Sequence, residues 1–360
     1  MRMSKVSAAV RVCLRRGAGL HRAAAVSVAA LGFGAAVAVA PVALATPDSA
    51  SVQTFEDEAS ARLRRWLQTN GCNVGGMHFG YCPGNNGKGR GAFIEQHTGI
   101  NSSDAQPSLL LHLPAELVLT AERAMESVPQ LRTLRDLTRG DGTALASALG
   151  RTAATDALLL TVFVLLARVL RTPAFADYVA ALPKNFDSPT VWSDKSPAEA
   201  CLEGTPLGAA VAAKRRWLHT LASNLPQTLR DAGMPDAALA LEAVDQRCAE
   251  GGEGDGGLLR LIRWADAVVW SRGLGLPRAE GGSQMCLLPG IDMVNHAEAG
   301  TEIAGWVPLM SGGVELHRRV QAAVVENKQH AIGAGAQWQE VTISYGDKVS
   351  ENSTPPRTRL

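Results

Sequence analysis

The sequence predicts an α+β protein in which strand-rich ends enclose a helical middle. Short apolar runs bounded by glycine, proline or asparagine occur up to residue 120 and return from residue 285. The stretch between them carries longer apolar segments with helical spacing. With 360 residues, 46% of them hydrophobic, and a formal charge of +1, the chain is able to bury one large core or two smaller ones.

The first 47 residues have the composition of a targeting segment rather than of a folded domain. Six basic residues precede the first acidic one, Asp48, and an uncharged Ala- and Val-rich stretch ends in Ala-Leu-Ala at 43–45. An organelle transit peptide, a secretory signal and a two-part plastid signal with a twin-arginine element at Arg15 all fit this pattern. We favour an organelle, plastid (chloroplast) ahead of mitochondrion, and expect no retained membrane span because Ala and Gly dominate the stretch.

Charge and cysteine content exclude several classes of protein. Acidic and basic residues are interleaved after position 48, so we expect no nucleic-acid partner, which would require a basic stripe. The six cysteines are scattered without a C-x-x-C pair, so we predict neither a disulfide framework nor a metal site. Cys72 and Cys82 flank a glycine-rich loop and would suit a bridge in an oxidising compartment, but we favour free thiols.

The N-terminal part begins with an amphipathic helix predicted over Phe55 to Gln68, which ends at an Asn-Gly pair. The stretch GNNGKGRGAFI, from Gly84, then leads into a short strand. Its spacing fits neither the P-loop nor the dinucleotide-binding pattern, so a kinase or an NAD enzyme is not expected. A strand that enters a turn at Pro114 is predicted within Ser108 to Thr120.

The middle of the chain is predicted to be a helical insert. Thr155 to Leu170 reads as a buried helix that is too short to span a bilayer. Tyr178 to Trp192 is interpreted as an extended connection with prolines, further helices start at Lys214, and a glycine-rich loop precedes a helix from Leu258. The predicted parts are 1–47 (targeting segment), 55–150 (N-terminal part), 151–257 (helical insert), 258–348 (C-terminal part) and 349–360 (disordered tail).

The helix from Leu258 carries an arginine on its apolar side. At about 100° per residue, Arg272 falls on the apolar arc, whereas Arg260 and Arg263 lie opposite it. A guanidinium directed toward a core is costly unless an anion or several acceptors meet it. Two interpretations remain open: a carboxylate partner from the protein or a ligand, or bonds back to the carbonyls at the helix end.

Two hydrogen-bonding residues, Asn295 and His296, follow the apolar run from Met285 to Val294. At the end of a buried strand they would point into a cleft, where an amide and a backbone are able to hold a purine edge. The alternative is a histidine that only completes local hydrogen bonding. Asp292 and His296 as metal ligands would lack a third ligand at a plausible spacing.

Two more strands are predicted toward the end of the chain, within Gly313 to Val325 and over Gln339 to Tyr345. In the second, apolar residues alternate with Thr342 and Ser344, so Tyr345 lies on the apolar face just before a glycine turn. A buried phenol needs a partner for its hydroxyl. The alternative role of this tyrosine is core packing.

Taken in order, these motifs resemble the SET-domain protein methyltransferases with a helical insert, the group similar to Rubisco large-subunit lysine methyltransferase and actin-histidine methyltransferase. The resemblance runs from about Leu63 to Lys348 and is carried by GRGAFI, YVAALP with WS, a helix ending in SR, LLPGIDMVNHA and VTISYGDK. DMVNH with a downstream SYG is its specific part. The implied fold is a SET-domain β-fold with an inserted helical region and a pseudoknot-like C-terminal segment, which brings Tyr345 beside His296.

The resemblance implies S-adenosyl-L-methionine as cofactor and transfer of its methyl group to a lysine, ahead of a histidine, of a protein substrate. In the family, the segment matching 88–91 wraps the cofactor, the arginine matching Arg272 meets its carboxylate, and the tyrosine matching Tyr345 lines the channel to the target nitrogen. We expect a monomer. The implied catalytic residue is Tyr345, and the implied cofactor-binding residues are Lys88, Gly89, Arg90, Gly91, Arg272, Asp292, Asn295 and His296.

The sequence departs from the family pattern at three places, one of which is a longer segment, QHAIGAGAQWQEV, before the tyrosine strand. Ser108 stands where relatives usually carry an acidic residue near the cofactor, and the chain ends twelve residues after Lys348, where relatives continue into a helical substrate-binding domain. That domain is therefore expected to be absent. The alternative function is a catalytically inactive SET-fold binding protein, or a truncated product without its substrate-binding domain.

Overall fold

The protein is described from a computed structural model. The residues that it describes are 56–81, 90–96, 109–139, 155–170, 174–192, 197–249, 257–278, 281–297, 301–319, 330–331 and 337–344. The predicted targeting segment, the predicted tail, Cys82, Lys88, Gly89, Ser108 and Tyr345 lie outside these ranges. Residues 186–219 belong to a smaller compact unit, inside the predicted insert, and the other described residues form a larger one.

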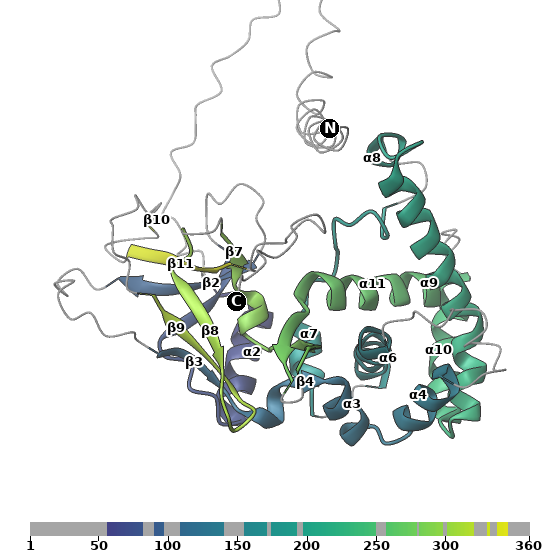
Figure 1. Cartoon of the computed structure of the whole chain (residues 1–360), viewed down its shortest axis with the longest axis horizontal. Helices are drawn as coiled ribbons and strands as arrows, with labels where there is room; N and C mark the ends of the chain where they lie inside the picture. Colours follow the sequence, from purple (N-terminus) through teal and green to yellow (C-terminus); the bar gives the residue numbers. More distant parts are fainter. Residues whose placement is uncertain are drawn as a thin grey trace, which may run out of the picture. The chain divides into compact units, whose positions relative to one another are not determined.

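Three small sheets of the larger unit combine strands from both ends of the chain (Figure 1). In the first sheet the order is β1-β2-β11-β10, with β7 parallel to β11; the second is β3-β9-β8 and the third β4-β6-β5. The early strands are β1 (Met77–Tyr81), β2 (Arg90–Gln96), β3 (Leu109–Leu113) and β4 (Leu119–Thr120). The late strands are β5 (Leu274–Pro277), β6 (Ser283–Leu287), β7 (Asn295–His296), β8 (Ala304–Pro308), β9 (Val314–Arg318), β10 (His330–Ala331) and β11 (Gln337–Ile343).

The register of these sheets joins the two ends of the chain directly. Ala92 of β2 is opposite Val341 of β11, and Leu113 of β3 is opposite Val314 of β9. Ala92, Leu113 and Val341 are completely buried, because the pairing places their faces in the core. The predicted α+β class, with strand-rich ends around a helical middle, is confirmed.

The helical region of the larger unit is built around α6 (Thr155–Leu170), which packs against α11 (Gly257–Arg272). Helix α6 is buried from Ala157 to Ala167, as its apolar composition on all sides predicts. The other helices are α2 (Glu58–Thr69), α3 (Ala121–Ser127), α4 (Leu131–Arg139), α7 (Ala176–Ala181), α8 (Pro197–Ala200), α9 (Pro206–Asp231) and α10 (Pro235–Ala249). Short 3-10 turns occur at Ala115–Leu117 (η1) and Ile291–Met293 (η2). None of the helices in the described ranges is long and apolar enough to cross a membrane.

Two local predictions were wrong in instructive ways. Tyr178 does not begin an extended connection but lies inside α7, where its ring stacks on Trp66 at a centroid distance of 6.2 Å. Arg263 was placed opposite the apolar arc of α11, yet it is only 8% exposed. Helical periodicity identifies one apolar face, but α11 is buried on more than that face because α6 and α10 both pack against it.

The smaller unit contains α8 and the first part of α9. Arg215 of α9 holds it together by donating from Nη2 to the backbone carbonyls of Pro189, at 2.7 Å, and Trp192, at 2.9 Å. Its Nη1 also pairs with the carboxylate of Glu199 in α8. A fork of guanidinium donors is suited to gathering several acceptors in this way.

Candidate functional site

The candidate site lies where β7 runs parallel to the end of β11. Asn295 is in register with Thr342 and His296 with Ile343, and the backbone amide of Ala297 donates to the carbonyl of Ile343 at 3.0 Å. The strand that leads to Tyr345 therefore runs beside the Asn-His pair. The position of Tyr345 itself and the threading of the C-terminal segment stay predictions.

A turn, rather than a strand end, presents the Asn-His pair. Strand β6 stops at Leu287, and the chain turns at Pro289 and Gly290, whose φ of 87° suits glycine, before the 3-10 turn η2. The predicted continuous strand from Met285 to Val294 is therefore corrected. The apolar side chains from Cys286 to Val294 are buried all the same, which is why composition alone did not separate strand from turn.

The side chain of Asn295 meets β2 and β11. Its Nδ2 donates to Oε1 of Glu340 at 2.6 Å. A Cβ placed on Gly91 would lie 2.9 Å from the same nitrogen and 3.1 Å from the ring of Phe93. A larger residue at position 91 would have to displace the Asn295 amide and the Phe93 ring, so glycine is favoured where β2 approaches these side chains. Glu340 was not predicted to be a site residue. The sequence feature that could have identified it is its position on the face of β11 opposite the apolar one.

Arg272, Asp292 and Tyr178 form a buried polar network. Nη1 of Arg272 donates to the backbone carbonyl of Asp292, and Nε of Arg272 is buried without a hydrogen-bond partner among the described residues. The Asp292 carboxylate accepts from the Tyr178 hydroxyl at 2.6 Å and from the Gly290 amide at 3.1 Å. Arg272 thus bonds to a backbone carbonyl of η2, which is neither a carboxylate partner nor a carbonyl at the end of its own helix.

Burial sets the electrostatics of this network. Removal from water raises the pKa of Asp292, although the charge of Arg272 and the bond from Tyr178 act in the opposite direction. Burial, and then the nearby Asp292 charge, raise the pKa of Tyr178 well above its usual value. The phenol therefore stays protonated and serves as a hydrogen-bond donor. Both carboxylate oxygens of Asp292 accept hydrogen bonds from protein donors, so this side chain has a structural role in the network.

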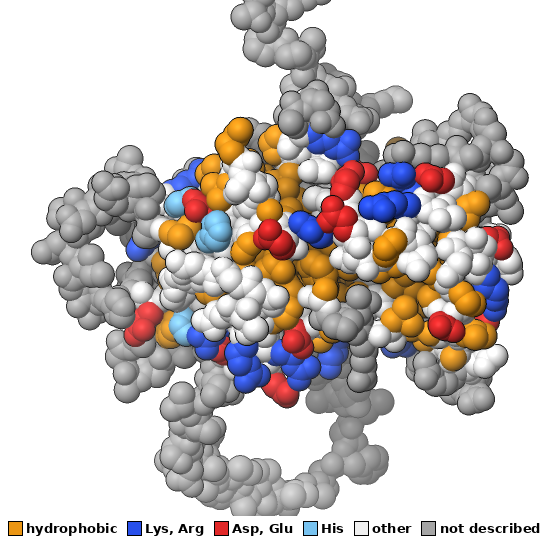
Figure 2. Space-filling model, turned by 90° about the horizontal axis from the view of Figure 1, so that it is seen from below, with side chains coloured by type: hydrophobic (Ala, Val, Ile, Leu, Met, Phe, Trp, Pro, Cys, Tyr) orange, Lys and Arg blue, Asp and Glu red, His pale blue; other side chains and the backbone are white. Residues whose placement is uncertain are grey.

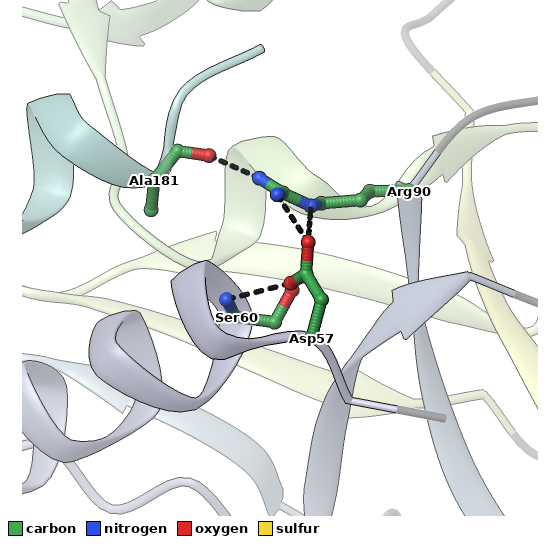
Figure 3. Close-up of polar contacts among 4 residues, drawn as sticks. All are labelled: Asp57, Ser60, Arg90 and Ala181. Carbon is green, nitrogen blue, oxygen red and sulfur yellow. Dashed lines mark hydrogen bonds and ion pairs between the residues drawn. The ribbon is translucent and has the colours of Figure 1, made fainter. Parts of the chain in front are cut away.

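Arg90 lies at the start of β2 and ties it to two helices (Figure 3). Its guanidinium pairs with the carboxylate of Asp57, the N-cap of α2, and donates to the carbonyl of Ala181 at the end of α7. The other oxygen of Asp57 accepts from the amide of Ser60 at 2.9 Å. Among residues 88–91, the described Arg90 thus uses its side chain to anchor the strand, which leaves its backbone and that of Gly91 as the candidates for ligand contact.

The described site residues fall into two adjoining groups. Gly91 and Asn295 meet on the sheet, Arg272 and Asp292 meet at η2, and β2 also contacts η2. His296 is exposed and is placed by its backbone pairing with Ile343. In the described part of the chain, no three His, Cys, Asp or Glu side chains gather in a way that would hold a metal ion.

The chain matches no protein-family model and no curated protein sequence. Among the solved structures to which it is similar are three that each cover 81% of this chain. These are the SET domain of LSMT bound to lysine and AdoHcy (16% identity, TM-score 0.47), Rubisco LSMT bound to AdoMet (15%, 0.49), and Rubisco LSMT bound to sinefungin and monomethyllysine (16%, 0.44). The chain spans about half the length of these structures, 53–54%.

Proposed function

We propose that the chain is an S-adenosylmethionine-dependent protein N-methyltransferase that acts on a lysine side chain. The observation that carries the proposal is the meeting of Gly91, Asn295 and the end of β11, with Arg272 held nearby. Each of these residues belongs to a motif through which the sequence resembles SET-domain methyltransferases. Their convergence from distant parts of the chain is what a shared ligand site requires.

Two features of the described residues fit the proposed cofactor. The Nε of Arg272 is a buried donor that lacks an acceptor, and a carboxylate is the acceptor that a guanidinium binds best. The missing side chain at Gly91 keeps the backbone of β2 open beside Asn295. Arg272 would hold the carboxylate of the cofactor, and the backbones of Gly91, Asn295 and His296 would border its nucleoside. When bound, the cofactor supplies a methyl group on a positively charged sulfur.

The chain's own residues then have to present a neutral amine to that methyl group. For a lysine with a reference pKa of about 10.4, deprotonation to the neutral amine at pH 7 costs roughly 4.6 kcal/mol of free energy. An apolar channel lowers this cost because it penalises the cation. We assign to Tyr345 the orientation of the amine, since a phenol with a pKa of about 10 is a poor base at pH 7 and alignment of bound reactants accounts for several kcal/mol.

Calorimetry on the full-length chain tests the first step. We expect S-adenosylmethionine to bind, and Arg272→Ala to weaken binding at least about tenfold, because it removes a charged hydrogen bond to the carboxylate. Arg260→Ala is the matched control, since it removes an exposed arginine from the same helix. Absence of binding to the wild type, with the protein folded, would support a non-catalytic SET-like protein instead.

Methyl transfer and location need separate experiments. Incubation with labelled cofactor and chloroplast extract should label a protein acceptor, and Tyr345→Phe should lower kcat more than it changes KM if this tyrosine orients the reacting groups. A fluorescent fusion of the first 50 residues tests our proposal that the chain is sent to plastids. Mitochondrial fluorescence would overturn the plastid assignment and leave the chemistry untouched.

A further inference from the structure

A cavity of about 430 Å³ lies among α2, α6, α7 and the segment that follows α7. Three of its lining residues are cationic, Arg62, Arg168 and Lys184, and one is acidic, Asp177. The rest of its wall consists of alanine, valine and leucine side chains. A concave site with a mostly apolar wall and a few polar groups is the usual form of a small-molecule site, and its volume falls in the range of about 300–1,000 Å³ for such sites.

Arg168 is exposed, as is Lys184, and it is held in place at the edge of this cavity. Its guanidinium carbon lies 4.0 Å from the ring centroid of Trp264, and Trp264 is itself fixed by donating from Nε1 to the carbonyl of Pro183 at 2.8 Å. Stacking uses the face of a guanidinium and leaves the N–H donors in its plane available. Partial burial of the guanidinium, and then the charge of Arg260, lower the pKa of Arg168.

The cavity has an excess of positive charge. Neither Arg168 nor Lys184 forms an ion pair within the described ranges. Arg62 pairs with Glu58 one helical turn away, at 3.0 Å, but the two side chains are 44% and 84% exposed, so this pair is weak. Three cations against one lining carboxylate favour an anion with more than one negative charge.

We propose that this cavity binds a small organic phosphate monoester. The phosphate would sit between Arg168 and Lys184, and the organic part would lie against the alanine and leucine side chains of the wall. A phosphate dianion suits this arrangement because arginine recognises it through two parallel hydrogen bonds and lysine as a point charge.

This site is separate from the proposed methyltransferase site, and α7 stands between them. Asp177 and Ala180 of α7 line the cavity, whereas the Tyr178 hydroxyl and the Ala181 carbonyl contact Asp292 and Arg90. The proposal therefore goes beyond the methyltransferase assignment and does not depend on it.

Calorimetric titration of the full-length chain with phenyl phosphate, without S-adenosylmethionine, tests the proposal. We expect binding that Lys184→Gln weakens about tenfold or more, the effect of losing one charged contact. Arg168→Gln should do the same, with thermal unfolding used to check that loss of the Trp264 contact leaves the variant folded. Arg65→Gln is the control, because this exposed arginine is on α2 but does not line the cavity.

Three outcomes would overturn the proposal: no binding of phenyl phosphate at millimolar concentration, equal weakening by Arg65→Gln, or binding that Lys184→Gln leaves unchanged. Benzoate and inorganic phosphate serve as comparison probes. Benzoate that binds as tightly as phenyl phosphate would contradict the phosphate assignment, and inorganic phosphate that does so would contradict the role of the apolar wall. S-adenosylmethionine is titrated in a separate experiment, so failure of one proposal is distinguishable from failure of the other.

Discussion

At the scale of single residues, Tyr178 connects the helical region to the candidate site. Its hydroxyl is buried and donates at 2.6 Å to Asp292, whose backbone carbonyl in turn accepts from Arg272. The tyrosine thus supports the residue that positions the proposed carboxylate-binding arginine. Sequence reasoning placed Tyr178 in a connection and could not supply its partner, because Asp292 is far away along the chain.

Removal of that hydroxyl should destabilise the fold. Tyr178→Phe leaves a buried carboxylate oxygen without its donor, a loss of about 1–3 kcal/mol in the free energy of unfolding. Urea denaturation at pH 7 measures it. Tyr81→Phe is the control, since Tyr81 is 50% exposed and phenylalanine keeps its ring beside Arg90. Equal effects of the two substitutions would show that the Tyr178 hydrogen bond contributes nothing.

Asp292 should make stability depend on pH in an unusual direction. Burial raises its pKa above 3.8, so the folded state holds the proton more tightly than the unfolded state. Its contribution to stability is therefore fully present below pH 3.8 and is lost as pH rises through the raised pKa. We expect Asp292→Asn to remove this loss, so that its stability relative to wild type improves between pH 4 and pH 7 in urea titrations.

Asp57 serves as the comparison for Asp292, because its pKa is shifted in the opposite direction. Burial alone would raise the pKa of Asp57, but hydrogen bonds from Ser60 and the Arg90 charge outweigh it and lower the pKa. The stability that Asp57 contributes is thus present above pH 3.8 and is lost as pH falls through the lowered pKa. The assignment for Asp292 would be contradicted if the difference in the free energy of unfolding between the wild type and Asp292→Asn did not change over the pH range.

At the scale of elements, the start of α2 combines two functions of one carboxylate. Asp57 caps the helix and also pairs with Arg90 of β2. The sequence predicted the helix but placed its start at Phe55, three residues before the observed start at Glu58, because the charged stretch before Glu58 continues the helical pattern. The partner of the cap could not be predicted, since Arg90 follows the glycine-rich stretch and reaches α2 only through the sheet.

Two substitutions separate these functions. Asp57→Asn keeps an equally good N-cap but loses the charge pair, whereas Asp57→Ala loses both. We expect Asp57→Ala to be less stable than Asp57→Asn by about 1 kcal/mol, the usual contribution of a cap. Thermal unfolding at pH 7 gives the two values. Identical stabilities would mean that the cap contributes nothing and that the ion pair accounts for the whole effect.

Local patterns predicted the long elements well and the short ones poorly. The helix Thr155–Leu170 has the predicted bounds because its apolar run is long and uniform. The turn η2 was read as part of a strand, since three residues within an apolar run carry no periodicity. Strand β7 is only two residues long and exists because β11 lies beside it.

At the scale of the whole molecule, the two ends of the larger unit share one core. Cys72 and Cys286 come from opposite ends of that unit, and both are buried free thiols. Burial raises the pKa of each to about 12, so both should resist alkylation at pH 8. Cys201 is exposed. The cysteines of this chain therefore report on how cooperatively the ends unfold.

Alkylation in increasing urea, followed by mass spectrometry of each cysteine peptide, tests this. We expect Cys201 to react in the native protein, and Cys72 and Cys286 to become reactive together at the urea midpoint of global unfolding. Labelling of Cys201 without urea confirms that the reagent is active. Reaction of Cys286 well before Cys72 would show that the C-terminal strands open independently of the N-terminal ones.

The distribution of charge on the surface was predicted in part by the order of charged residues along the chain. On the face drawn in Figure 2, basic and acidic side chains are interspersed with apolar ones. Interleaved charge along the chain predicted this mixture. It did not predict the cavity with Arg62, Arg168 and Lys184, whose charges come from three separate segments and gather only when α2, α6 and α7 pack together.

The sequence by itself determined the α+β class, the buried helix α6, the arginine at the end of α11 and the glycine at position 91. These depend on residues a few positions apart, so periodicity and composition reveal them. Only the tertiary structure decided that Asn295 meets Glu340 and Gly91, that Asp292 bonds to Tyr178, and that Arg90 reaches Asp57 and Ala181. Such contacts join segments far apart in sequence, and they form because burial of a common core brings the segments together.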